Sequence, residues 1–139
     1  METPYPRTPH DRPVAPLTCR PPVRAPLEGR WVRLEPQEAE AHGAELFTAG
    51  QEAAIWDYLA YGPFARLEDH AAVIEAQAAS SDPLFFAIRP LDGPAMGQAS
   101  FLEIAPERGA IEIGHIWFGP QLQRTRGATE ALYLMLRTA

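Results

Sequence analysis

The residues best suited to chemistry lie in one basic turn near the end of the chain, QRTRGAT at positions 123–129. Arg124 and Arg126 supply two guanidinium groups, and Gly127 and Ala128 are small enough for a ligand to approach the backbone amides. An amphipathic segment follows, so these amides would lie at a helix N-terminus, where the helix dipole favours an anion. The turn therefore predicts a site for a small anionic group.

The elements on either side of the turn would hold it in place. Residues 110–118 form an apolar segment with strand character, and Pro120 marks a break after it. A helix is expected to begin near Thr125, whose hydroxyl can cap free amides. Its apolar residues recur at helical spacing and predict one stripe packed on a sheet. That stripe comprises Ala128, Ala131, Leu132, Met135, Leu136 and Ala139.

The remaining segments predict the sheet and helices that support this unit. Residues 27–36 alternate apolar and polar side chains and predict a first strand. Helical segments then precede three closely spaced strands. The helices are expected at residues 38–49, 53–59 and 67–79, and the strands at residues 84–89, 95–104 and 110–118. This order predicts an α+β fold with a mixed, mainly antiparallel sheet flanked by helices.

Composition narrows the classes of function. The chain has 139 residues and a net charge of −6, which argues against a general nucleic-acid binder. It contains no long apolar run, so no membrane span is predicted, and its histidines show no metal-ligand spacing. A single cysteine, Cys19, fits a cytoplasmic location. The positive charge near the end of the chain favours a small anionic ligand over a long polyanion.

Residues 1–26 hold eight of the fifteen prolines. Proline removes backbone donors and disfavours helix in the residue before it. We therefore predict a disordered or polyproline II arm over residues 1–26 and one domain over residues 27–139. The arm would be either an unstructured extension or a proline-rich ligand for a partner protein.

Residues 123–132, QRTRGATEAL, resemble the pyrophosphate-binding motif of the GNAT acetyltransferases, in the branch that includes ribosomal-protein N-acetyltransferases of the RimJ/RimL type. Gln123 takes the first motif position and Ala128 the last, whereas Arg126 stands where the first Gly is usual. Other segments resemble further family elements in the same order along the chain. These are LEGRWVRLEP, WDYLAYGPF, DPLFFAIR, MGQASFLEI and EIGHIWFGPQL. The resemblance covers residues 27–139.

This resemblance implies the N-terminal part of a GNAT (acyl-CoA N-acyltransferase) fold with acetyl-CoA as co-substrate. Backbone groups of the family's fourth strand would bind the pantetheine, and the basic turn would bind the diphosphate. The implied contacts are Ile116, Trp117, Phe118, Gln123, Arg124, Thr125, Arg126, Gly127, Ala128 and Thr129. The family continues with further strands that close the groove, so the resemblance implies an incomplete domain, truncated after the motif.

Acetyl transfer to an amine needs a base for the amine's proton and a donor for the oxyanion. Glu112 and His115 are the candidate catalytic bases, with Glu103 as a weaker third. Strand alternation puts Glu112 and His115 on opposite faces unless a bulge intervenes. A solvated carboxylate and a half-buried sheet histidine are the alternative interpretations.

The pocket for the amine that accepts the acetyl group is expected in the aromatic-rich segment WDYLAYGPF. Trp56, Tyr58 and Tyr61 would line the acceptor pocket or serve as core and cover. The resemblance implies an acetyl-CoA-dependent N-acetyltransferase that acts by direct attack on a primary amine, of a protein N-terminus or a small molecule. The alternative is a non-catalytic fragment that binds CoA weakly, or an interaction module completed by another chain. A homodimer would be one form of that module.

Overall fold

The computed structural model describes residue 8, residue 15 and residues 18–139. The described part contains five strands and three α-helices, with two short 3-10 helices among them. The strands are β1 Leu27–Glu28, β2 Val32–Pro36, β3 Leu84–Pro90, β4 Gly97–Ala105 and β5 Ala110–Phe118. The helices are α1 Ala39–Ala49, η1 Ala53–Trp56, α2 Leu67–Ala78, η2 Pro106–Arg108 and α3 Arg126–Thr138.

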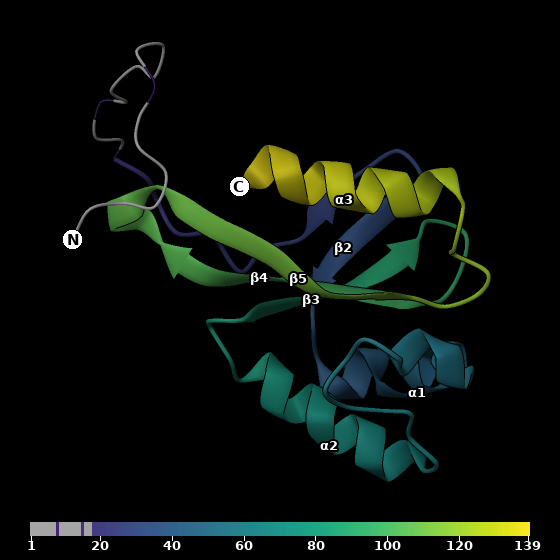
Figure 1. Cartoon of the computed structure of the whole chain (residues 1–139). Helices are drawn as coiled ribbons and strands as arrows, with labels where there is room; N and C mark the ends of the chain where they lie inside the picture. The colour runs from purple at the N-terminus through teal and green to yellow at the C-terminus, as the bar shows by residue number, and fades with distance from the viewer. Residues whose placement is uncertain (1–7, 9–14, 16–17) are drawn as a thin grey trace.

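The strands form one sheet in the order β1-β2-β3-β4-β5, in which every neighbouring pair is antiparallel. Figure 1 shows α3 on one face of this sheet and α1 and α2 together on the other. β5 forms an outer edge, and the loop that leaves it leads to the start of α3. The predicted α+β fold, with a mainly antiparallel sheet flanked by helices, is confirmed.

The face under α3 is an apolar core. Phe86 and Phe101, from neighbouring strands, are fully buried and meet edge to face with 5.8 Å between ring centroids. The stripe predicted for α3 was partly wrong, because Leu136 is 68% exposed and Leu132 only half-buried. Leucines lie on both sides of the predicted stripe, so helical periodicity alone did not decide which of them pack against the sheet. The buried residues of α3 are Gly127, Ala128, Ala131, Leu134 and Met135.

The face under α1 and α2 also buries apolar side chains, but charged groups lie among them. Glu35 Oε2 is 2.7 Å from His42 Nε2, and Glu35 Oε1 is 3.0 Å from Arg89 Nε. Arg89 also pairs with Glu45, at 2.8 Å between Nη2 and Oε2. Burial raises the pKa of Glu35, but the hydrogen bonds from His42 and Arg89 outweigh burial and hold that pKa below its usual value. The network joins α1 to the sheet.

Residues 27–36 form a short hairpin instead of the single strand predicted from their alternation. β1 and β2 pair antiparallel, and the amide of Gly29 donates to the carbonyl of Val32 at 2.9 Å across the turn. A residue far along the chain stabilises this turn, because the carboxylate of Glu130 in α3 accepts hydrogen bonds from its amides. Local alternation carries no information about such a distant partner.

Most of the predicted arm, residues 1–26, lies outside the described residues. Within the described part, Arg24 contacts the end of α2, where its Nη2 donates to the carbonyl oxygen of Ala78 at 2.5 Å. The same nitrogen donates to the carbonyl oxygen of Gln37 at 3.3 Å. In the described part of the chain, no helix is both long and apolar enough to cross a bilayer.

Candidate functional site

The start of α3 has the geometry of an anion site. Thr125 is the N-cap, as predicted, and its Oγ1 accepts a hydrogen bond from the amide of Ala128 at 3.2 Å. The same oxygen donates to the carbonyl of Leu122 at 2.7 Å, which anchors the turn. The first amides of a helix have no intrahelical partner. Those of Arg126 and Gly127 therefore lie at the end of α3 where the helix dipole favours an anion.

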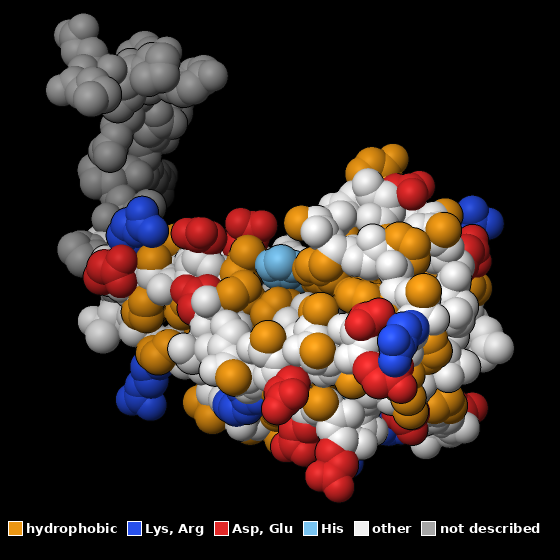
Figure 2. Space-filling view, turned by 90° about the horizontal axis from the view of Figure 1, so that it is seen from below, with side chains coloured by type: hydrophobic (Ala, Val, Ile, Leu, Met, Phe, Trp, Pro, Cys, Tyr) orange, Lys and Arg blue, Asp and Glu red, His pale blue; other side chains and the backbone are white. Residues whose placement is uncertain are grey.

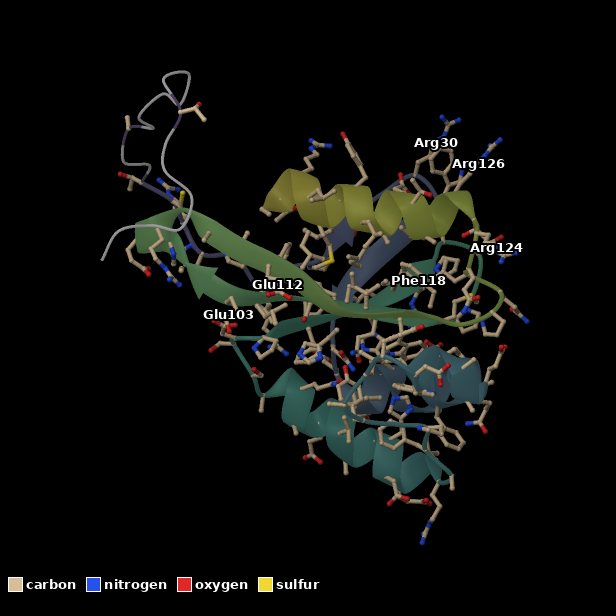
Figure 3. The ribbon with its side chains drawn as sticks, in the orientation of Figure 1. Arg30, Glu103, Glu112, Phe118, Arg124 and Arg126 are labelled. Carbon is tan, nitrogen blue, oxygen red and sulfur yellow. The ribbon has the colours of Figure 1, made fainter. Side chains whose placement is uncertain are left out.

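Arginines lie on both sides of this helix start. Figure 3 shows Arg126 beside Arg30 of the β1–β2 turn, and Arg124 on the loop that leads into α3. The guanidinium carbons of Arg30 and Arg126 lie 5.2 Å and 5.9 Å from the centroid of the Trp31 ring. Arg126 is a helical residue whose side chain packs over Trp31, so a residue larger than Gly is accommodated at this motif position. The arrangement concentrates positive charge where the amides are.

Glu130 ties the helix start to the β1–β2 turn. Its carboxylate accepts hydrogen bonds from the amides of Arg30 at 2.7 Å, Trp31 at 2.7 Å and Val32 at 3.0 Å. Burial raises the pKa of Glu130, but these three hydrogen bonds outweigh burial and hold the pKa below its usual value. Gly127 permits the close approach, because a Cβ there would lie 2.8 Å from Val32 Cγ1. Sequence reasoning missed this role of Glu130, since only a motif match marked the residue.

Two cavities lie near this end of the sheet. One of about 570 Å³ opens beside the helix start, between the β1–β2 turn, the β3–β4 loop and α3. The other, also of about 570 Å³, lies between α1 and the segments that precede β4 and follow β5. Neither cavity is lined by Glu112 or His115. The anion site and the candidate acid–base residues therefore occupy separate parts of the surface.

A β-bulge brings the two candidate bases to one face of the sheet. Near the middle of β5 the register on β4 shifts, because β5 has one extra residue there. His115 lies at this bulge with a φ of 49°. The shift in alternation places His115 on the same face as Glu112, toward α1 and α2. Glu103 lies at a second bulge, and Figure 3 shows Glu103 and Glu112 away from the three arginines.

His115 is held by an aromatic ring and a chain of amides. The Tyr61 ring stacks on its imidazole with 5.8 Å between centroids, and Tyr61 Oη lies 3.1 Å from His115 Nδ1. Gln98 Nε2 lies 2.9 Å from Tyr61 Oη and 3.2 Å from the carbonyl oxygen of His115. Gln37 Nε2 donates to the side-chain oxygens of Gln98 and Gln77. Burial raises the pKa of Tyr61, while hydrogen bonds from Gln98 and Gln77 act in the opposite direction.

The three aromatic residues predicted for the acceptor pocket have different environments. Trp56 is 3% exposed in the core under α1 and α2, and its Nε1 donates to the carbonyl of Gly50 at 2.8 Å. Tyr58 is 98% exposed. Tyr61 is the one of the three that contacts a candidate base. Figure 2 views the molecule from the side of α1 and α2 and shows a histidine at the surface among hydrophobic side chains.

β5 offers its backbone at the edge of the sheet, where no further strand pairs with it in the described part of the chain. Ile116 and Phe118 pack toward α3, whereas Trp117 packs toward α1 and α2. Gln123 Nε2 donates to the carbonyl of Phe118 at 2.9 Å, which holds the basic turn against the end of β5. The described residues contain no cluster of three or more candidate metal ligands.

Solved structures share this fold. A GCN5-related N-acetyltransferase from Brucella melitensis matches with a TM-score of 0.83 and 36% sequence identity, over 86% of this chain and 56% of that one. A GNAT-family protein from Chromobacterium violaceum, described as an acetyltransferase, matches with a TM-score of 0.80 and 34% identity, over 94% of this chain and 70% of that one. The chain belongs to the GNAT family.

The GNAT membership confirms the family predicted from QRTRGATEAL and the order of elements. The chain spans 56% of the length of the Brucella structure. A candidate ribosomal-protein-serine acetyltransferase from Vibrio cholerae shares the GNAT fold alone, with a TM-score of 0.65 and 15% identity over 80% of this chain and 64% of that one. No family model and no curated protein matches the chain.

Proposed function

We propose that this GNAT chain binds acetyl-CoA and transfers its acetyl group to a primary amine, on a protein N-terminus or a small molecule. The observation that carries the proposal is the basic start of α3, which directly follows the edge strand β5. Free helix amides and guanidinium groups suit a diphosphate. The acetyltransferase relatives supply the class of chemistry.

The residues around the start of α3 would hold the nucleotide end of acetyl-CoA. The amide groups of Arg126 and Gly127 and the guanidinium group of Arg124 would contact the diphosphate. Gln123, Thr125, Ala128 and Thr129 complete this proposed site. The backbone of Ile116, Trp117 and Phe118 would contact the pantetheine along the edge of β5. Bound there, acetyl-CoA would supply an acetyl group activated as a thioester.

Direct attack requires a neutral amine. In the proposed reaction Glu112 takes the proton whose loss makes the amine neutral, and the amine nitrogen then adds to the acetyl carbon to give a tetrahedral oxyanion. When the oxyanion collapses, the bond from carbon to sulfur breaks, and the leaving thiolate takes up the proton that the nitrogen loses, so that the thiol is released. Glu112 is exposed and His115 half-buried on the same face of the sheet. An acceptor on that face would meet both groups. Tyr61 lies beside His115 there, Tyr58 is at the surface, and the buried Trp56 supports the segment.

Narrower assignments are part of the same proposal. Membership of the RimJ/RimL branch is supported by the motif QRTRGATEAL. A cytoplasmic location is supported by the single cysteine. An amine acceptor on a peptide or small molecule, instead of a nucleic acid or membrane, is supported by the net charge of −6 and its local distribution.

Titration of the full chain with CoA, followed by isothermal calorimetry, tests the binding site. We expect saturable binding that weakens about tenfold or more in the Arg124→Ala plus Thr129→Ala variant, because contacts to a charged group each contribute about 1.5–3 kcal/mol. Arg137→Ala, at the other end of α3, changes the net charge equally and should leave the affinity unchanged. Absence of both heat and a thermal shift on adding CoA would overturn the proposed site.

Thiol release from acetyl-CoA in the presence of amines tests the reaction. A peptide with a free N-terminus and a small primary amine are the two acceptor probes. We expect amine-dependent release that the Arg124→Ala plus Thr129→Ala variant reduces.

A second function, a binding module without turnover, is favoured by the open edge of β5. An unpaired edge strand readily pairs with another chain, and the nearby side chains of Ile111 and Ile113 are only partly buried. Such a module would bind CoA weakly or have its sheet completed by a partner, with a homodimer as one form. Light scattering that finds a monomer, together with amine-dependent thiol release, would exclude it.

A further inference from the structure

The side-chain amide of Gln98 has one possible orientation. Its Nε2 lies 3.2 Å from the backbone carbonyl oxygen of His115. A carbonyl oxygen can only accept a hydrogen bond. Turning the amide over would place the Gln98 oxygen against that carbonyl. The carbonyl of His115 therefore fixes which end of the Gln98 amide is the donor, and Gln98 Oε1 then accepts a hydrogen bond from Gln37 Nε2 at 3.2 Å.

This orientation sets the direction of the next hydrogen bond. The same Gln98 nitrogen lies 2.9 Å from Tyr61 Oη, so the amide donates and the phenol oxygen accepts. Gln77 also donates a hydrogen bond to this oxygen. Because the phenol oxygen already accepts two hydrogen bonds, its own proton points to His115 Nδ1, which lies 3.1 Å away. A ring nitrogen that accepts a hydrogen bond carries no proton. In the neutral imidazole the proton of His115 therefore resides on Nε2.

The surrounding rings hold the imidazole in this position. The Tyr61 and His115 rings are nearly parallel, with an interplanar angle of 22°. Phe85 packs on His115 from β3, with 5.1 Å between centroids. The bulge at His115 turns the side chain toward these partners. The hydrogen-bond chain therefore acts on a ring whose orientation is already restricted.

We propose that Tyr61 and Gln98 are positioning residues that hold neutral His115 with its proton on Nε2, so that His115 acts as a hydrogen-bond donor on the acceptor face and not as the base. A neutral imidazole protonated at Nε2 cannot take the amine's proton at that nitrogen. Its other nitrogen is occupied by the Tyr61 hydroxyl. The proton of the amine then falls to Glu112. This catalytic consequence rests on the proposed acetyl transfer, whereas the position of the proton on His115 does not.

Nitrogen-15 NMR of the labelled full chain, at a pH where the imidazole is neutral, tests the proton's position directly. The His115 signals are assigned by their loss in His115→Gln. We expect Nδ1 to show the chemical shift of an unprotonated ring nitrogen and Nε2 that of a protonated one. A protonated Nδ1 would overturn the proposal, whatever the activity of the chain.

Tyr61→Phe tests the positioning role while keeping the stacked ring. We expect the proton of His115 to become distributed over both ring nitrogens in this variant. Tyr58→Phe is the matched control, because Tyr58 is 98% exposed, and it should leave the His115 signals unchanged. Unchanged His115 signals in Tyr61→Phe would overturn the role of Tyr61. Gln98→Leu should have the same effect as Tyr61→Phe, and unchanged signals there would overturn the role of Gln98.

The catalytic role is tested by comparing His115→Gln with His115→Ala. A glutamine amide can donate a hydrogen bond from near the position of Nε2, so we expect His115→Gln to keep kcat within about tenfold of the wild type. Removal of the donor in His115→Ala should cost about 10²–10³ in kcat. Equal losses in both variants would overturn the donor role. A wild-type chain without turnover would count against the proposed function, and the NMR measurement would still decide where the proton lies.

Discussion

The two faces of the sheet use different physical interactions. Under α3 the core is apolar and built from large side chains such as Phe86, Phe101 and Met135. The face under α1 and α2 also has an apolar core, but hydrogen-bonded and charged groups cross it. The buried polar side chains of the described residues all belong to that side, and they are Gln37, His42, His70, Gln77, Gln98 and Ser100.

This difference corresponds to two tasks. The free energy of apolar burial is non-directional and roughly proportional to the apolar area removed from water. It can therefore stabilise the packing of α3 on the sheet, which places the helix N-terminus next to the end of β5. It cannot specify where a proton lies. Hydrogen bonds are directional, and unpaired buried polar groups are costly, so the amide chain beneath His115 can fix one ring orientation. Packing therefore places α3 on the sheet, and hydrogen bonds of Thr125 and Glu130 hold its first turn. The candidate acid–base site depends on a longer polar network.

The largest effect is expected from breaking the apolar face. Phe86→Ala removes a fully buried ring that contacts Phe101 and should lower the free energy of unfolding by about 3–5 kcal/mol. Chemical denaturation measures the change. Leu91→Ala, at a position 56% exposed, is the control and should change it by no more than about 0.5 kcal/mol. Similar losses in the two variants would contradict a core centred on Phe86.

The buried histidine His70 on the face under α1 and α2 should make the free energy of unfolding depend on pH. His70 is 2% exposed, and burial lowers its pKa to about 4 from its ordinary 6.5. Between these values the unfolded chain binds a proton that the folded chain does not. The free energy of unfolding should therefore be highest above pH 6.5 and fall as the pH drops toward about 4. The total loss should approach about 3 kcal/mol.

Denaturation of the wild type and of His70→Phe across this range separates the contribution of His70. The variant keeps an aromatic ring against Phe64, whose ring stacks on His70 at 4.4 Å. Carboxylates with a lowered pKa, such as Glu35 and Glu45, change the free energy of unfolding only when the pH falls below their ordinary pKa of 4.5. Most of the pH range between 6.5 and 4 is therefore free of their effect. A wild-type curve as flat as that of the variant between pH 6.5 and 4 would contradict the prediction.

A smaller effect is expected from the link between the helix start and the β1–β2 turn. Glu130→Gln leaves one carbonyl oxygen for three amides and should lower the free energy of unfolding by about 2 kcal/mol at neutral pH. Because the folded pKa of Glu130 is lowered, its contribution is complete above the unfolded value and is lost as the pH falls through the folded value. The difference between wild type and variant should therefore shrink in acid.

Denaturation at neutral and acid pH checks this prediction, with Glu68→Gln as the matched control. Glu68 pairs with Arg66 on the surface, and its side chain is 70% exposed. The control should change the free energy of unfolding by no more than about 0.5 kcal/mol. A constant difference between wild type and Glu130→Gln at all pH values would contradict the assignment of the effect to the carboxylate.

The sequence by itself determined the local features of this protein. Apolar segments between turns identified β3, β4 and β5, helical spacing identified α3, and the hydroxyl of Thr125 identified its cap. The motif at residues 123–132 identified the family. Each of these depends on backbone periodicity or on neighbours within a few residues, which the sequence displays directly.

Only the tertiary structure decided how distant residues combine. The bulge at His115 arises from pairing with β4, and it places the candidate bases on one face. Glu130 accepts hydrogen bonds from a turn about 100 residues away, and Gln98 of β4 contacts Tyr61 and His115. A hydrogen bond needs both partners within about 3 Å and correctly directed. That condition is set by register and packing across the whole sheet, which no local pattern records.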